Sequence, residues 1–105
     1  MPDNMSLRVS IRKSAKKDYR DAALYINKHD KEAAKMFVIA LRKTISNLAL
    51  FPTMGKFTGG DIKVLRFLLI KYSYWVVYTY SNTQIDILRV VHVSKDFNTV
   101  AITQD

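Results

Sequence analysis

Two arginines and a histidine, Arg66, Arg89 and His92, stand within apolar runs of the most apolar stretch of this 105-residue chain, which extends from residue 63 to residue 93. A charge inside a buried strand is costly unless it reaches an anion or a wetted groove. A guanidinium can bind a carboxylate or a phosphate through two parallel hydrogen bonds, so residue type does not distinguish a protein partner from a nucleic acid. What these residues do therefore depends on the surface that they face.

Period-two alternation assigns Arg66 to the side of its strand opposite its apolar neighbours Leu65 and Phe67. Two interpretations stay open. Arg66 either points to solvent from the uncovered side of a sheet, or it lines that open side together with Arg89 and binds an anionic partner. His92 stands between two valines, a setting more typical of a packed structural histidine than of a proton donor.

Hydrophobic periodicity predicts an α+β fold with the order β-α-α-β-β-β. Alternation indicates a half-buried strand at residues 7–12, and apolar spacings of three and four indicate helices at about 15–28 and 31–50, capped by Ser14 and Asp30. Apolar and aromatic runs indicate strands at 62–70, 73–80 and 84–93, joined by hairpin-length connections. We expect the helical hairpin to pack on one face of a small antiparallel sheet that the first strand joins.

The remaining segments are polar or rich in glycine. Residues 53–61 hold all three glycines and predict a flexible loop, with Lys56 and Phe57 at its centre. Residues 94–105 form a polar tail, either a short edge strand or disordered. The whole chain, 1–105, is expected to be a single domain with a core at about 7–97 and a flexible tail at 98–105.

The composition of the chain argues against a metal-dependent or cofactor-dependent activity. The chain has no cysteine and only two histidines, far apart in sequence, so neither a metal site nor another cofactor is expected. It lacks a signal-peptide h-region and a long uncharged apolar run, so we expect a cytoplasmic protein that does not enter a membrane.

The net charge of the chain is +8, and residues 1–60 carry twelve Lys or Arg against five Asp or Glu. This basic half is either a solvated surface or a surface for a polyanion or an acidic protein segment.

Six short motifs occur in a defined order along the chain. They are SAKKD at 14–18, LALFPTMG at 48–55, VLR at 64–66, YSYWVVY at 72–78, ILRVVH at 87–92 and KD at 95–96. None is specific alone. The ordered set, which spans about residues 7–97, resembles the RelE/ParE toxin superfamily of bacterial type II toxin–antitoxin modules.

The resemblance implies two different activities. RelE-like members cleave mRNA in the ribosomal decoding site, whereas ParE-like members bind DNA gyrase and stall it. Metal-independent RNA cleavage needs a base, cations for the phosphorane and an acid for the leaving oxygen, and the candidates here are Lys56, Arg66, Arg89, His92 and Lys95. RelE-like toxins add a C-terminal Tyr or His, and the aromatic residue near that position is Phe97, which has no hydroxyl. The ParE-like branch is therefore favoured.

A ParE-like chain would be a gyrase inhibitor that acts by binding, with no catalysis of its own, and an antitoxin would neutralise it. The expected contacts with gyrase or antitoxin are Lys56, Phe57, Arg66, Arg89, His92 and Lys95. The antitoxin would lay an acidic amphipathic segment against the basic half of the chain. Its apolar docking surface would favour a homodimer of the free toxin or a toxin–antitoxin hetero-oligomer. Three alternatives stay open: a RelE-like endonuclease acting on mRNA and the ribosome, an inactive homologue, and a basic nucleic-acid-binding module.

Overall fold

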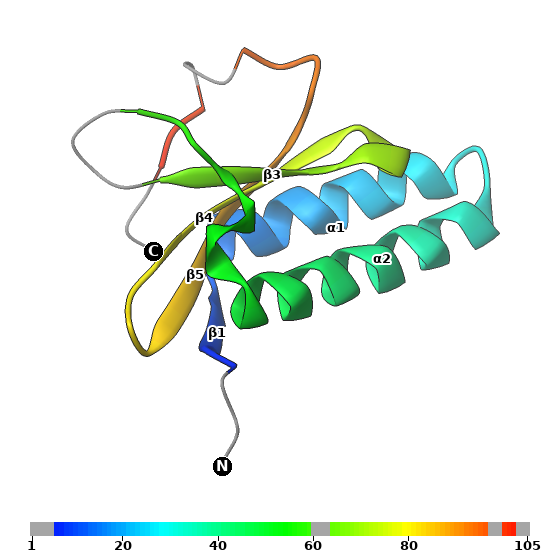
Figure 1. Cartoon of the computed structure of the whole chain (residues 1–105). Coiled ribbons are helices and arrows are strands. Elements are labelled where there is room, and N and C mark those ends of the chain that lie inside the picture. The colour runs from blue at the N-terminus through cyan, green and yellow to red at the C-terminus, as the bar shows by residue number, and fades with distance from the viewer. Residues whose placement is uncertain (1–5, 60–63, 97–99, 103–105) are drawn as a thin grey trace.

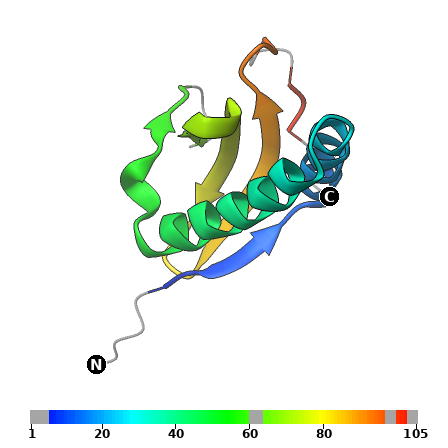
Figure 2. The same ribbon diagram turned by 90° about the vertical axis from the view of Figure 1, so that its right-hand side faces the viewer.

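Two antiparallel helices lie across one face of a five-stranded sheet (Figures 1 and 2) in the computed structural model, which describes residues 6–59, 64–96 and 100–102. The fold class is α+β, as the sequence predicts. The elements are β1 (Arg8–Ile11), α1 (Lys13–Asn27), α2 (Lys31–Leu50), the 3₁₀ turn η1 (Pro52–Met54), β2 (Lys56–Phe57), β3 (Leu65–Leu69), the 3₁₀ turn η2 (Ile70–Tyr72), β4 (Tyr74–Tyr80) and β5 (Gln84–His92).

The strand order in the sheet is β1-β5-β4-β3-β2. Strands β3, β4 and β5 form the predicted antiparallel meander, and β2 pairs antiparallel with β3. Strand β1 is the exception to the antiparallel arrangement, because it pairs parallel to β5, with Arg8 opposite Gln84 and Ile11 opposite Ile87. The first and last strands of the chain are therefore neighbours.

The two helices begin in different ways. Asp30 caps α2 as predicted, since its carboxylate accepts hydrogen bonds from the backbone N–H groups of Glu32 at 3.0 Å and Ala33 at 3.1 Å. The prediction that Ser14 caps the first helix is wrong, because α1 already begins at Lys13. The Ser14 hydroxyl instead donates a hydrogen bond of 3.2 Å to the backbone carbonyl of Leu88, which ties α1 to β5.

Part of the predicted loop after α2 forms a short strand of the sheet. Within it, β2 pairs with β3, so that Lys56 lies opposite Arg66. The buried Tyr78 hydroxyl holds this segment in place: it donates to the Pro52 carbonyl at 2.7 Å and accepts from the Gly55 N–H at 2.9 Å. A Cβ atom at Gly55 would collide with this hydroxyl. The approach of the backbone to Tyr78 therefore requires glycine.

Side chains are buried on both faces of the sheet. The face under the helices holds the main core, whose largest fully buried members are Tyr78, Phe37, Leu41, Leu48, Ile85 and Ile87. The other face holds a smaller cluster, Val64, Val77, Leu88 and Val91, against which Trp75 and Val100 pack. The second face is therefore partly covered, and the prediction of an open face holds for only part of it.

Three predicted segments fall partly outside the described residues. They are the loop, at positions 60–61, the strand predicted at 62–70, at positions 62–63, and the tail, at 97–99 and 103–105. The described parts of the tail, 94–96 and 100–102, contain no strand.

Candidate functional site

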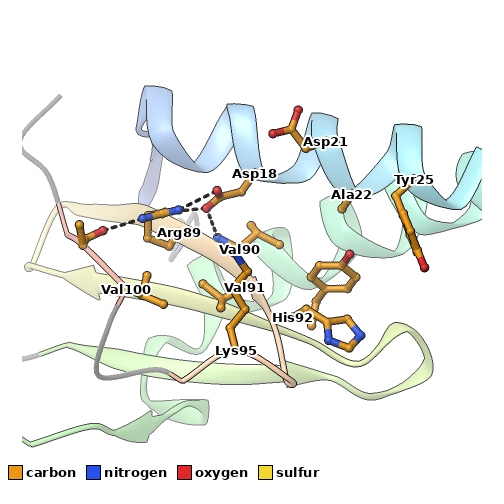
Figure 3. A pocket seen from close by; sticks show the side chains of 12 residues that line it. Asp18, Asp21, Ala22, Tyr25, Arg89, Val90, Val91, His92, Lys95 and Val100 are labelled. Atoms are coloured by element: carbon orange, nitrogen blue, oxygen red, sulfur yellow. Dashed lines mark hydrogen bonds and ion pairs between the residues drawn. The ribbon is translucent and has the colours of Figure 1, made fainter.

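A cavity of about 510 Å³ lies between α1 and the second half of β5 (Figure 3). Strand β1 pairs with β5 only as far as Ile87, so α1 is the neighbour of β5 beyond that point. The cavity has the size of a pocket for a small ligand or a few inserted side chains. Its lining comes from α1, β4, β5 and the segment after β5: Asp18, Asp21, Ala22, Tyr25, Tyr74, Arg89, Val90, Val91, His92, Lys95, Val100 and Ala101.

Arg89 lies at one end of this cavity and is bound by the chain itself. Its Nε and Nη2 atoms donate to the two carboxylate oxygens of Asp18 at 2.7 and 2.9 Å, and its Nη1 donates to the Ala101 carbonyl at 2.7 Å (Figure 3). Asp18 also accepts from the Val90 N–H at 2.9 Å. The guanidinium is therefore paired with an internal anion and turns toward α1 and the C-terminal segment. Arg89 and Arg66 both pair with Val77 in the register of the sheet and so start on the same face, but the Arg89 guanidinium is bound by its own chain there.

A β-bulge lies directly before Arg89 in β5. Across β4, Val77 pairs with Arg89 and Tyr78 pairs with Ile87, which leaves Leu88 as the extra residue. A bulge bends its strand and changes the direction of the side chains beside it. The sequence carries a trace of this irregularity, because the apolar residues Ile87 and Leu88 are adjacent and break the period-two pattern.

His92 lies at the other end of the cavity. Its Nδ1 accepts a hydrogen bond of 3.0 Å from the Ser94 N–H and lies 2.8 Å from the Ser94 hydroxyl. A backbone N–H can only donate, so the neutral ring carries its proton on Nε2. The ring stands edge-on to Tyr74, with 5.0 Å between centroids. Burial, and then the nearby Tyr25, raise the pKa of Tyr74, so its phenol stays protonated at neutral pH.

The cavity therefore brings together three of the six predicted contact residues, Arg89, His92 and Lys95. The sequence analysis did not select the acidic and aromatic wall that faces them, made by Asp18, Asp21, Ala22 and Tyr25 of α1. Helical spacing could have found this wall, because residues three, four and seven apart share one flank of a helix.

The other three predicted residues lie elsewhere, at the β2–β3 end of the sheet. Lys56 and Arg66 are cross-strand neighbours. The Arg66 guanidinium carbon lies 4.3 Å from the centre of the Trp75 ring, a cation–π contact that fixes it on the second face. Phe57 is 57% exposed beside them. The predicted site is therefore divided between two places.

The two places differ in what they can bind. In the cavity, the Arg89 donors already meet a carboxylate and a carbonyl, whereas Lys95 is exposed and His92 is half-buried. At the β2–β3 end, an exposed lysine and an exposed phenylalanine flank a half-buried arginine, which suits an acidic and partly apolar protein surface. Phe97, the candidate position for a catalytic hydroxyl, lies outside the described residues.

The described residues also bear on metal binding and on the spanning of a membrane by a helix. They contain no group of three or more His, Asp or Glu side chains placed to hold a metal ion. Within the same residues, no helix is long and apolar enough to span a bilayer.

Known proteins share this architecture. A solved structure from the chromosomal ParDE TA system of P. aeruginosa superposes with a TM-score of 0.71 at 15% sequence identity, covering 86% of this chain and 99% of that chain. At this identity the likeness shows the fold alone. No curated protein sequence matches the chain. The family profile of the ParE toxin of type II toxin-antitoxin systems, parDE, matches residues 9–97, and the chain therefore belongs to the ParE toxin family.

Proposed function

We propose that this toxin inhibits DNA gyrase by binding to it in the cytoplasm, without catalysing a reaction of its own, and that a cognate antitoxin neutralises it. Membership of the ParE family supports gyrase as the target, because the ParE-like branch binds gyrase. The family also belongs to two-component toxin–antitoxin systems, which implies an antitoxin partner.

The observation that carries the proposal is the ion pair between Arg89 and Asp18. A ribonuclease would need a cation in this part of the sheet to stabilise the charge of the phosphorane. Arg89 instead donates two hydrogen bonds to the Asp18 carboxylate, and its Nη1 donates to the Ala101 carbonyl. A guanidinium neutralised by its own chain is poorly suited to a phosphate, which favours binding over cleavage.

The β2–β3 end of the sheet is the surface that we propose for gyrase. There Lys56 and Phe57 are exposed on a short edge strand, and Arg66 is fixed beside them by Trp75. A positive and partly apolar patch on a rigid sheet can bind a protein surface that carries carboxylates. His92 and Lys95, at the cavity, stay predicted contacts of gyrase or antitoxin.

Replacing Lys56 with alanine is expected to raise the toxin concentration for half-inhibition of gyrase about tenfold, equivalent to one charge-assisted hydrogen bond of roughly 1.4 kcal/mol. The assay follows supercoiling of a relaxed plasmid by purified gyrase and counts linear DNA trapped in the cleaved state. Lys71→Ala removes an exposed lysine from η2 and serves as the matched control, with no change expected.

The gyrase assay, run beside a cell-free translation assay that detects cleaved mRNA, distinguishes the alternatives. Wild-type protein that leaves gyrase active but cuts mRNA within codons on translating ribosomes would replace the proposal with the RelE-like endonuclease. Protein that affects neither target would identify an inactive homologue. Equal loss from Lys56→Ala and Lys71→Ala would assign the effect to net charge and remove the β2–β3 surface from the proposal.

For the antitoxin we propose a separate docking surface along α2, the α2 apolar stripe. Its members Met36, Ile39 and Leu50 are 44%, 58% and 45% exposed, and they lie on the outer side of the helix. Exposed Lys35 and Lys43 lie four residues before and after Ile39 on the same side of the helix, so Lys43 falls within the stripe. An amphipathic helix with an acidic border matches this pattern, with apolar residues in contact and carboxylates near the lysines. Such a surface joins the toxin and the antitoxin in a hetero-oligomer.

Ile39→Glu is expected to weaken antitoxin binding at least tenfold, because it places a carboxylate in the apolar contact and repels an acidic partner. Isothermal titration calorimetry with the purified antitoxin measures the change. Leu24→Glu introduces the same charge at an apolar residue of α1 that is likewise 58% exposed, and it is the control. Unchanged affinity in Ile39→Glu would place the antitoxin on another face.

A further inference from the structure

The outer side of α1 carries a row of cations, the α1 basic face, formed by Lys13, Lys16, Lys17 and Arg20. Their spacing of three, four and seven residues puts them on one side of the helix. All four are exposed. At 1.5 Å per residue, the row is about 10 Å long.

This row is unfavourable for the helix that carries it. The cations lie toward the positive end of the helix dipole, and like charges four residues apart repel one another. The first turn holds no acidic residue, and Arg12, at the N-cap, makes no side-chain cap hydrogen bond. Selection for helix stability alone would place acids there.

The acids of α1 do little to neutralise the row. Asp18 points away to Arg89, so the ion pair at the cavity removes one carboxylate from the basic face. Asp21 pairs with Lys17 at 2.8 Å, in an exposed pair that contributes little. Within the part of the chain that the structure describes, Lys13, Lys16 and Arg20 form no ion pair.

The absence of apolar side chains on the row indicates the kind of partner. Protein interfaces are centred on apolar and aromatic anchors, whereas DNA interfaces are polar and strongly positive. Between Lys13 and Arg20 the described helix exposes no large apolar residue, and the first one is Leu24. The α2 apolar stripe shows the opposite character. The row also lacks the exposed aromatic rings on which single-stranded bases stack.

We propose that the α1 basic face binds the phosphate backbone of duplex DNA without reading its sequence. This inference goes beyond the proposed inhibition of gyrase and does not depend on it. Backbone contacts of this kind fix position and orientation on a duplex and leave the base edges unread. A toxin with this surface would find its target where DNA is already held.

The test measures binding of the full-length protein to a fluorescein-labelled 20-base-pair duplex by anisotropy across a series of KCl concentrations. Three to four phosphate contacts predict a slope of log K against log salt of roughly −3 to −4. The variant Lys13→Glu/Lys16→Glu/Arg20→Glu is expected to bind at least tenfold more weakly and to show a slope near zero. Its Tm is expected to equal or exceed that of the wild type, because the new carboxylates favour the start of the helix.

The matched control is Lys31→Glu/Arg42→Glu/Lys71→Glu, which makes the same change in net charge on exposed positions of α2 and η2. It is expected to keep at least a third of the wild-type affinity for the duplex.

Equal losses of affinity in the two triple variants would overturn the proposal, since binding would then follow net charge alone. Absence of wild-type binding at 50 mM KCl would also overturn it. So would tighter binding to a polyglutamate peptide than to the duplex, because the surface would then suit an acidic protein. Gyrase inhibition by the α1 variant, measured separately, shows whether the two functions fail together.

Discussion

Replacing Asp18 with alanine is expected to lower the free energy of unfolding by about 3 kcal/mol, at the lower end of the range for breaking a buried ion pair. The Asp18 side chain is only 15% exposed and that of Arg89 23%. Alanine leaves the guanidinium without its anion and the Val90 N–H without its acceptor. Each group then keeps its desolvation penalty. Urea unfolding followed by circular dichroism measures the loss, and Tm falls by roughly 10 °C or more.

Asp21→Ala is the matched control for this prediction. It removes the same side chain three residues further along α1, where the pair with Lys17 is mostly exposed. Its expected cost is below about 0.5 kcal/mol. The double variant Asp18→Ala/Arg89→Met is expected to be more stable than Asp18→Ala alone, because it removes the orphaned charge. If Asp18→Ala and Asp21→Ala unfold at the same urea concentration, the internal pair does not stabilise the fold.

Tyr78→Phe is expected to cost about 2 kcal/mol, since it leaves two part-buried backbone groups without their partner. The lost bonds are those to the Pro52 carbonyl and from the Gly55 N–H. Thermal unfolding measures the change. Tyr72→Phe is the control: its ring packs against Phe37 in the same core, and within the described residues its hydroxyl makes no hydrogen bond. A loss no larger than that of Tyr72→Phe would show that η1 and β2 are held by other contacts.

Loss of the proton from the same Tyr78 hydroxyl is expected to lower the stability of the protein at alkaline pH. Burial raises the pKa of Tyr78 above 10.0, and Tyr80 adds to the rise, while the hydrogen bond from Gly55 lowers it. The folded state therefore keeps the phenol protonated at a pH at which the unfolded chain loses the proton. Its contribution to stability is complete below pH 10.0 and is lost as the pH rises through the pKa of the folded state. The stability of Tyr78→Phe is expected to fall less steeply than that of the wild type over this range.

The main elements were predictable because burial imposes a repeat on a sequence. Phe37, Leu41 and Leu48 follow helical spacing, and Asp30 stands where a cap is needed. Strand β2 was not predictable, because it has only two residues, both exposed. It forms because Tyr78, 23 positions beyond Gly55, binds the backbone before it. Local patterns cannot reveal a contact that depends on so distant a residue.

The candidate site shows the same limit. Alternation correctly assigned Arg66 to the face opposite Leu65, because β3 is regular. Arg89 shares that face, since it also pairs with Val77 after the extra residue Leu88, but alternation did not reveal that its guanidinium is already bound. The partner of Arg89 is 71 positions away on α1. Periodicity can assign a charged residue to a face, but it cannot identify the distant carboxylate that binds it.

The parallel pairing of β1 with β5 has a consequence for the timing of synthesis. Strand β1 cannot pair until β5 has been synthesised, because Arg8 pairs with Gln84. Contacts between residues so distant in sequence form late in folding. Residues 8–11 therefore leave the ribosome well before the strand that they pair with, and this edge of the sheet stays incomplete until residues 84–87 have emerged as well.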